Sequence, residues 1–322
     1  MKITQLDLFS GIGGFHLGFE RAGYEVTSFF SEIDKHAIAV YKHQFPKSTY
    51  VGSVTDVRGG DLPRIDLITF GSPCQDFSLA GKRKGMEGDR SSLILEAIRL
   101  IRECRPRVFI WENVKGTFSS NSGEDFSAIL QEFTNIGGYR LEWQLLNTSW
   151  FLPQNRERIY LVGYSTTTKR NWRGVFPIGE GNQSNSELEC SRKAITKCLT
   201  ARGQEGHAGM QLVKVKQIGT KLDSNGGTQP YQQDRVYDAE GIVPALNQGK
   251  SDLIIKNNYR IRRLTPIECE RLQGFPDNHT AFGNYDGQVK PMSNTQRYKQ
   301  CGNAVTVDVV QAVAEQCKPL FK

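Results

Sequence analysis

Two reactive side chains each stand directly after a short apolar stretch of the chain. Cys74 lies in the run Gly-Ser-Pro-Cys-Gln at residues 71–75, and Glu112 lies in Trp-Glu-Asn-Val at residues 111–114. A thiolate can attack an electron-poor carbon, and a carboxyl group can exchange a proton with a substrate. A single cysteine beside a proline is more often structural, so the hypothesis of a nucleophile and an acid facing one substrate depends on the pairing with Glu112.

A glycine-rich run, Asp-Leu-Phe-Ser-Gly-Ile-Gly-Gly at residues 7–14, offers a second kind of chemistry. Glycines let the backbone approach a ligand closely, and a helix that begins there supplies free N–H groups. Glu32 follows about twenty residues later, where an acid binds ribose hydroxyls in dinucleotide-binding folds. The G-x-G-x-x-G spacing of those folds is not met, because three residues with side chains separate Gly14 from the next glycine. The run therefore predicts a nucleoside cofactor without a pyrophosphate and argues against an NAD-dependent enzyme; a plain tight turn is the alternative.

The first half of the chain alternates short β-rich stretches with stretches of helical periodicity. The expected strands are Ile3–Phe9, Val26–Ser31, Ile65–Phe70, Val108–Trp111, Leu141–Thr148 and Ile159–Tyr164. The expected helices are Gly14–Ala22, Lys35–Phe45, Ser92–Cys104 and Asp125–Ile136. Several strands are continuously apolar, which is typical of a parallel sheet buried on both faces. The pattern predicts an α/β fold with a doubly wound, mostly parallel sheet, whose carboxyl edge carries both reactive residues.

Polar and glycine residues mark several helix ends. Asp34 and Ser91 are expected N-caps, and Gly23 is an expected helix stop. A further helix is expected over Leu264–Gly274, because Thr-Pro-Ile-Glu near its start forms a capping-box pattern with proline at the first helical position. The last expected helix is amphipathic and covers Ala304–Gln316.

The character of the chain changes between Ser165 and Arg260, a stretch rich in Gly, Gln, Asn, Ser and Thr. Short β-like pieces at Met210–Val215 and Gly241–Leu246 stand among loops there. A second, smaller, irregular domain is expected in this stretch, with a long disordered insertion as the alternative. The formal net charge of the chain is +7, which suits a polyanionic partner such as nucleic acid.

Length and composition exclude several other classes of protein. A chain of 322 residues can form one large domain or two unequal ones. No apolar run approaches the ~20 residues that cross a bilayer, and the N-terminus lacks a signal-peptide core, so a cytoplasmic protein without a membrane partner is expected. The seven cysteines are an odd number without a Cys-x-x-Cys pair, so neither a disulfide framework nor a metal site is expected.

Six runs closely resemble, in sequence and in order, the motifs of the DNA cytosine-5 methyltransferases of bacteria and phages. They are the glycine-rich run, Pro-Cys-Gln, Glu-Asn-Val, Gln-Asn-Arg-Glu-Arg at 154–158, the run from Arg263 to Pro276, and Gln-Cys-Gly-Asn-Ala-Val at 300–305. Pro-Cys-Gln alone is weak evidence, but six ordered motifs across almost the whole chain are specific. The resemblance implies transfer of a methyl group from S-adenosyl-L-methionine to C5 of a cytosine in a specific duplex DNA sequence.

The resemblance also implies roles for individual side chains. The Cys74 thiolate would add to C6 of the cytosine, while Glu112, protonated or sharing a proton, would hydrogen-bond N3 and the exocyclic amine. Arg158 would contact the base near O2, Arg156 would order the nucleophile loop or a phosphate, and Asn113 would hold the loop near the base. The residues that would contact the cofactor are Phe9, Gly11, Gly13, Glu32, Ser53, Val54, Asn303 and Val305.

Two positions depart from the family's pattern around the adenine. Ser53 stands where an acid is frequent, so its hydroxyl or backbone would have to make the contact. Ile33 follows Glu32 where an aromatic residue often stacks, although a branched apolar side chain can still pack on the ring.

DNA binding would require a mobile loop, because a base inside a duplex is out of reach of Cys74 and must be flipped out. Residues 75–90 would close over the flipped nucleotide, and residues 165–260 would read base edges in the major groove. The expected DNA contacts are Gln75, Ser78, Lys82, Arg83, Lys84 and Arg90, although the Lys-Arg-Lys run can also be a solvated charged loop. The expected partner is double-stranded DNA, bound by a monomer at the nucleoid, with a cognate restriction endonuclease acting separately.

This assignment predicts a catalytic and cofactor-binding domain at 1–175, completed by 298–322, a target-recognition domain at 176–285 and a hinge at 286–297. A transfer-RNA cytosine methyltransferase is the nearest alternative, since those proteins share Pro-Cys-Gln and Glu-Asn-Val, but their Cys-Phe-Thr tripeptide is absent from this sequence. A catalytically inactive DNA-binding relative is another alternative, although such proteins usually lose the cysteine or the glutamate.

Overall fold

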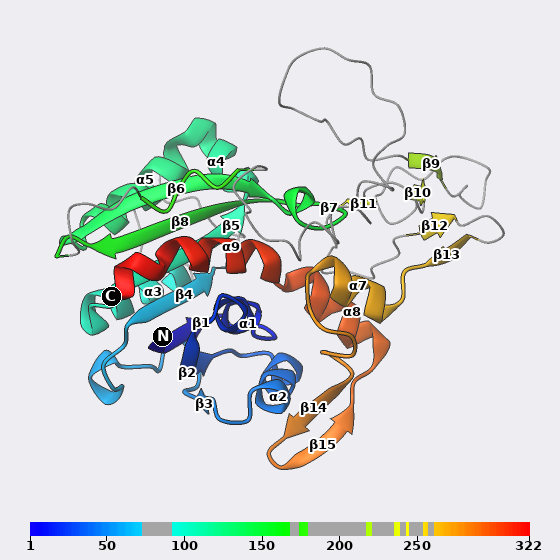
Figure 1. The fold of residues 1–322 in the computed structure, drawn as a ribbon, viewed down its shortest axis with the longest axis horizontal. Coiled ribbons are helices and arrows are strands. Elements are labelled where there is room, and N and C mark those ends of the chain that lie inside the picture. The colour runs from blue at the N-terminus through cyan, green and yellow to red at the C-terminus, as the bar shows by residue number, and fades with distance from the viewer. Residues whose placement is uncertain are drawn as a thin grey trace.

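A mostly parallel, seven-stranded sheet forms the centre of the protein (Figure 1). The computed structural model describes residues 1–72, 92–167, 174–179 and 264–322, together with the backbone of five short strands between 217 and 263. The strands of the central sheet follow the order β3-β2-β1-β4-β5-β8-β6. Their bounds are β1 Lys2–Leu8, β2 Glu25–Ser31, β3 Thr49–Tyr50, β4 Leu67–Gly71, β5 Val108–Val114, β6 Tyr139–Asn147 and β8 Glu157–Ser165.

The order of connection reverses between two neighbouring strands of this sheet. β1 pairs in parallel with β2 on one side and with β4 on the other. β4 and β5 are also parallel, whereas β8 is antiparallel to both β5 and β6. The carboxyl ends of β1 and β4 therefore form a topological switch point, where open α/β sheets bind their ligands. The predicted doubly wound, mostly parallel fold is confirmed.

Helices cover both faces of the sheet (Figure 1). One apolar cluster joins α1 and α9 to one face, through side chains such as Phe19 and Val313. A second cluster joins α3 and α5 to the other face, through side chains such as Ile98 and Phe133. The helix bounds are α1 Gly14–Arg21, α2 Lys35–Gln44, α3 Ser92–Cys104, α4 Gly116–Ser119, α5 Glu124–Thr134, α7 Pro266–Leu272, α8 Asn294–Asn303 and α9 Val307–Cys317. Within the described residues, no helix is both long enough and apolar enough to cross a membrane.

The elements predicted for the first half of the chain are present, with ends that differ by a few residues. Asp34 caps α2, because its carboxylate accepts hydrogen bonds from two backbone N–H groups of the first turn at 2.9 and 3.4 Å. Gly23 has a φ of 85° just beyond α1, a conformation that suits glycine and ends the helix. Thr265 and Glu268 form the predicted capping box of α7. The predicted N-cap Ser91 lies outside the described residues.

A hairpin and a helix that the sequence analysis does not predict follow α7. The hairpin pairs β14 (Phe282–Tyr285) with β15 (Gln288–Pro291), and its two-residue turn places Asp286 at φ 50° and Gly287 at φ 97°. An Asp-Gly pair between two short strands is the signal that could have revealed it. Helix α8 is polar and buries only Gln300–Gly302, so it lacks the apolar periodicity by which helices are recognised.

A four-stranded sheet lies in, and just after, the stretch that the sequence predicts to be a second, irregular domain. Its order is β13-β12-β10-β9, with bounds β9 Gln217–Thr220, β10 Arg235–Asp238, β12 Ile254–Lys256 and β13 Ile261–Arg263. A further strand, β11 (Val243–Pro244), pairs with β7 (Gln154–Asn155) and falls inside the predicted β-like piece Gly241–Leu246. The other predicted piece, Met210–Val215, lies outside the described residues, and the domain boundaries stay a prediction.

Buried polar side chains connect β1, β4 and α2 within the core. Asp7 is fully buried and accepts hydrogen bonds from Thr69 Oγ1 at 2.7 Å and from the Tyr41 hydroxyl at 3.4 Å. The Tyr41 oxygen also lies 2.9 Å from Ser28 Oγ and 3.1 Å from His16 Nδ1. Burial raises the pKa of Asp7 to about 8, because a charged carboxylate is poorly solvated in the core. The Asp7 carboxyl group is therefore mostly protonated at neutral pH.

We expect Asp7→Asn to raise the free energy of unfolding by at least about 2 kcal/mol at pH 8 and to change it little near pH 4. The folded-state pKa of about 8 lies above the ordinary value of 3.8, so the folded protein holds a proton that the unfolded chain releases. This contribution to stability is complete below pH ~4 and is lost as the pH rises through 8. Asparagine stays neutral throughout, so the urea-unfolding curves of variant and wild type should diverge as the pH rises. The exposed Asp61→Asn serves as the control, and an Asp7→Asn curve that runs parallel to the wild type would contradict the raised pKa.

Candidate active site

Two side chains of β5 fix the chain where it leaves β4. Trp111 Nε1 donates a hydrogen bond to Ser72 Oγ at 3.0 Å, and Asn113 Nδ2 donates to the Ser72 carbonyl at 3.2 Å. Both Trp111 and Ser72 are buried, so these bonds are shielded from water. Ser72 stands two residues before Cys74, which itself lies outside the described residues. Ser72 and Trp111 are not among the site residues predicted from the sequence, although each is a close neighbour of a predicted catalytic residue.

The carboxyl group of Glu112 lies at this edge of the sheet, in a residue that is 8 % exposed. Its register partner on β4 is Gly71, where a Cβ atom would come within 3.0 Å of Glu112 Oε2. The glycine therefore leaves room for the carboxyl group. The other oxygen, Oε1, forms an ion pair with Arg158 at 3.1 Å from Nε, which orients the carboxyl group.

Strand β8 supplies Arg158 from the far side of β5. Its Nη1 donates to the Glu157 carbonyl at 2.8 Å, so the guanidinium is held against the main chain while it pairs with Glu112. The Asn113 side-chain oxygen accepts hydrogen bonds from the next backbone N–H at 2.8 Å and from Thr117 Oγ1 at 3.2 Å. The structure thus brings Glu112, Asn113 and Arg158 together on two adjacent strands.

Arg156 has buried carbonyl groups as its partners. The residue is 4 % exposed, and its Nη1 and Nη2 donate to the carbonyls of Gly302 at 3.3 Å and Ala304 at 2.8 Å. Burial, assisted by the nearby charge of Arg158, lowers the pKa of Arg156 to about 10, so the guanidinium is still charged at neutral pH. It therefore ties the segment before β8 to the backbone on both sides of Asn303. A role for Arg156 toward the nucleophile loop or a phosphate stays a prediction.

We expect Arg156→Lys to lower the free energy of unfolding by about 1–3 kcal/mol. An ammonium group lacks the planar fork that bonds two carbonyls at once, so a buried acceptor at Gly302 or Ala304 would lose its partner. Urea unfolding at pH 7.5 measures the change. The exposed Arg64→Lys is the matched control, and a shift no larger than that of the control would show that the two carbonyl contacts contribute little.

The glycine-rich run forms the turn between β1 and α1. Phe9, Gly11 and Gly13 have φ angles of 51°, 55° and 84°, in the left-handed region that glycine adopts readily and phenylalanine rarely. The Gly11 N–H donates to Glu32 Oε2 at 2.9 Å, so the predicted ribose-binding acid is in direct contact with the loop.

The C-terminal part of the predicted cofactor site packs against this turn. A Cβ atom at Gly14 would come within 2.6 Å of Val305 Cγ2, so only glycine permits this approach. Asn303, two residues earlier, is exposed at the end of α8. The structure therefore joins the first and last predicted motifs, which are almost 300 positions apart, at one end of the sheet.

The predicted adenine contacts lie after β2 and β3. The Gly52 carbonyl accepts a hydrogen bond from Ser31 Oγ at 2.8 Å, which ties this segment to the strand end that carries the predicted ribose-binding acid. Ser53 Oγ lies 2.9 Å from Thr55 Oγ1. Val54 is 4 % exposed and its side chain packs in the core. The predicted contact with the adenine would therefore have to come from the Val54 backbone.

The remaining predicted site residues lie outside the described residues. They are Cys74, Gln75, Ser78, Lys82, Arg83, Lys84 and Arg90. Their roles stay predictions.

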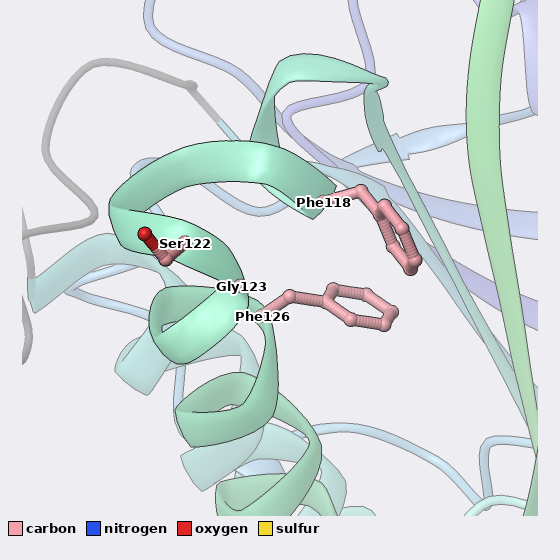
Figure 2. A pocket seen from close by; sticks show the side chains of 4 residues that line it. All are labelled: Phe118, Ser122, Gly123 and Phe126. Carbon is pink, nitrogen blue, oxygen red and sulfur yellow. The ribbon is translucent and has the colours of Figure 1, made fainter.

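A hollow of about 400 Å³ lies beside α4. Figure 2 shows its lining, Phe118, Ser122, Gly123 and Phe126, with the two phenylalanine rings close together. Trp143 of β6 completes the aromatic group, with ring centroids 5.4 Å from Phe118 and 5.2 Å from Phe126. Among the described residues, the lining contains no predicted catalytic or cofactor residue, and we assign no ligand to it.

The sequence of this chain is similar to the sequences of one protein family. The family model for C-5 cytosine-specific DNA methylases matches residues 3–319. The type II methyltransferase M1.ScrFI of Lactococcus lactis subsp. cremoris is 34 % identical over 319 residues, which cover 98 % of this chain and 78 % of that protein. The type II methyltransferase M.NlaX of Neisseria lactamica is 33 % identical over 317 residues, which cover 97 % and 95 %.

A solved structure shows the same fold. The Dnmt2 methyltransferase of S. pombe superposes with a TM-score of 0.70 at 20 % sequence identity, covering 99 % of this chain and 100 % of that one. The family match extends over nearly the whole chain and includes the strand ends described above. This chain belongs to the C-5 cytosine-specific DNA methylases and is a DNA cytosine-5 methyltransferase.

Proposed function

We propose that the chain transfers a methyl group from S-adenosyl-L-methionine to C5 of a flipped-out cytosine in a specific duplex sequence, through a covalent bond between Cys74 and C6. The observation that carries the proposal is the arrangement of three neighbouring strand ends. β1 ends in the glycine loop, β4 leads toward Cys74, and β5 presents Glu112. Cofactor, nucleophile and acid would thus be supplied to one place from adjacent strands.

The position of Ser72 supports Cys74 as the nucleophile. Extended backbone can carry the Cα atom of Cys74 no more than ~7 Å from that of Ser72, two residues before it. Ser72 is bound by Trp111 and Asn113, the two neighbours of Glu112. The covalent connection would therefore hold Cys74 near the acid, and a shared substrate ring needs both groups within reach.

The proposed reaction begins when the Cys74 thiolate adds to C6 of the cytosine and forms an S–C bond. The displaced electron pair moves toward C5 and N3, where the Glu112 carboxyl group hydrogen-bonds the ring and stabilises the developing charge. C5 would then bond to the electrophilic methyl group that S-adenosyl-L-methionine, when bound, supplies, as the bond from that methyl group to the sulfonium sulfur breaks. The C5 proton then passes to a base, the S–C bond breaks, and the thiolate leaves as the ring double bond re-forms. Arg158, paired with Glu112 at 3.1 Å, would hold the carboxyl group and contact the base near O2.

The residues around the glycine loop fit S-adenosyl-L-methionine. Glu32 accepts hydrogen bonds from the backbone N–H groups of Gly11, Ile33 and Asp34. A carboxylate has about four acceptor positions, so one is left for a ribose hydroxyl. The Ile33 side chain is 79 % exposed beside it and offers an apolar surface to the adenine ring. Val305, packed on the loop, would close the pocket together with Asn303.

DNA binding completes the proposal. Residues 75–90 would close over the flipped nucleotide, with Lys82, Arg83 and Lys84 on phosphates, and residues 165–260 would read base edges. The catalytic domain would comprise 1–175 and 298–322, the recognition domain 176–285 and the hinge 286–297. The chemistry needs no second subunit, so we expect a monomer at the nucleoid. The type II names of the relatives favour a cognate restriction endonuclease that acts separately.

Methyl transfer from isotopically labelled S-adenosyl-L-methionine, to duplex DNA and to transfer RNA in parallel, tests the proposal. We expect label in the DNA only, recovered as 5-methylcytosine after hydrolysis to nucleosides. Methylation-sensitive sequencing of DNA from cells that express the protein would then give the recognition sequence. Labelling of transfer RNA alone would contradict the proposed substrate.

A further inference from the structure

The carbonyl group of Ile12 lies in the middle of the cofactor loop, between the left-handed residues Gly11 and Gly13. Within the loop itself, the Gly13 N–H donates to the Ser10 carbonyl at 3.0 Å. The Ile12 carbonyl instead accepts a hydrogen bond from His279 Nε2 at 2.9 Å, and His279 lies 267 positions later in the chain. A distant side chain therefore holds the centre of the loop.

His279 is buried, with 4 % of the residue exposed, and its ring packs against Phe275 with centroids 4.5 Å apart. Phe275 belongs to the same buried apolar cluster as Ile12 of the loop, and a Cβ atom at Gly14 would come within 3.4 Å of its Cζ. Burial lowers the pKa of His279 to about 4, so the imidazole is neutral near pH 7. A hydrogen bond to the Ile12 carbonyl then requires the proton on Nε2, which fixes the tautomer.

The turn that carries His279 is held from its other side by Glu270 of α7. Glu270 is fully buried and accepts hydrogen bonds from the backbone N–H groups of Asn278 and Thr280, each at 2.8 Å. It also pairs with Arg297 Nη2 at 2.9 Å. The two backbone donors stand directly before and after His279 in the sequence. Glu270 therefore fixes the turn on both sides of His279, and this turn positions the imidazole next to the loop.

We infer that His279 is a positioning residue for cofactor binding: its Nε2–H, presented by the turn bound to Glu270, fixes the Ile12 carbonyl and with it the loop conformation that receives S-adenosyl-L-methionine. The identity of the cofactor rests on the proposed function. Without this bond a buried carbonyl loses its partner, and the glycine-rich backbone gains other conformations. Cofactor binding would then have to order the loop first, which weakens affinity.

The test compares variants of the full chain by calorimetric titration with S-adenosylhomocysteine, the demethylated product, at pH 7.5. His279→Phe keeps the ring and its packing on Phe275 but removes the donor. We expect it to weaken binding about 5- to 30-fold, to raise KM for S-adenosyl-L-methionine by a similar factor and to leave kcat within about twofold. His43→Phe is the control, since His43 is a half-buried histidine of α2 that forms no hydrogen bond with the loop in the part of the chain that the structure describes.

A second pair of variants separates positioning from folding. His279→Gln carries an amide N–H at the distance of Nε2 and should bind within about threefold of wild type, whereas His279→Asn carries the same amide one methylene too short and should bind as weakly as His279→Phe. Unchanged Kd values in His279→Phe and His279→Asn, even with lower melting temperatures, would overturn the inference and leave the proposed function intact. If wild type itself fails to bind S-adenosylhomocysteine, the proposed cofactor is wrong and the inference fails with it.

Discussion

Replacing Cys74 with alanine is expected to reduce methyl transfer to duplex DNA by at least about 10³-fold, with DNA affinity within about threefold of wild type. The proposed reaction makes its first covalent bond through this sulfur, and without it C5 of cytosine is too poor a nucleophile to attack the methyl donor. Positioning of the base and the cofactor does not depend on the thiol, so binding should survive. Initial rates with a labelled methyl donor and gel-shift titration with the same duplex measure the two quantities.

Cys104→Ala is the matched control for this experiment. Cys104 is a free thiol near the end of α3, and burial raises its pKa to about 11, so its thiolate is scarce at neutral pH. The control should keep the wild-type rate within about twofold. Substantial methylation by Cys74→Ala, or a comparable loss in Cys104→Ala, would contradict the assignment of the nucleophile.

Replacing Glu112 with glutamine is expected to lower kcat by about 10²- to 10⁴-fold, with smaller changes in KM for DNA and cofactor. Glutamine has nearly the same shape, so it fits opposite Gly71, where a Cβ atom would already be 3.0 Å from Glu112 Oε2. It cannot share a proton with N3 as the electron pair moves into the ring. The effect should therefore appear in the transition state more than in binding, and pre-steady-state single-turnover rates measure it.

Glu157→Gln controls for the loss of a carboxylate close to the site. Glu157 pairs with Lys115 at 2.9 Å in a partly exposed position, and its carbonyl, not its side chain, contacts Arg158. Its variant should retain activity within about threefold. A Glu112→Gln variant as active as this control would remove Glu112 from the mechanism.

The sequence predicts the framework of the site well because local signals agree with the global fold. Continuous apolar runs mark the buried strands, and glycine and aspartate mark the ends of α1 and α2. The strand β5 is longer than predicted: it ends at Val114 and not at Trp111, because β8 continues to pair with it up to the register partners Val114 and Arg158. The polar residues after Trp111 gave no sign that the strand continues. Where the strand ends depends on its pairing with a neighbouring strand, which a single sequence does not show.

Other features of the site depend on contacts between distant residues, and a single sequence does not contain them. Arg156 belongs to a polar motif and is predicted to meet a phosphate or a loop, yet it is buried against carbonyls about 146 positions away. The bond from His279 to Ile12 joins residues even further apart. Both side chains are polar, and a buried polar side chain needs a hydrogen-bond partner. The partner here is a backbone carbonyl group that comes close only when the chain has folded.

The most direct test of the central claim is covalent trapping on a duplex that carries 5-fluorocytosine at the target position. Addition of Cys74 to C6 and methyl transfer can proceed on this base, but fluorine cannot leave C5 as a proton does, so the S–C bond should persist. We expect a protein–DNA adduct that survives denaturation, forms only with S-adenosyl-L-methionine present, maps to Cys74 by peptide sequencing and is absent from Cys74→Ala. An active enzyme that forms no adduct with this duplex, or an adduct at another residue, would contradict the proposed mechanism.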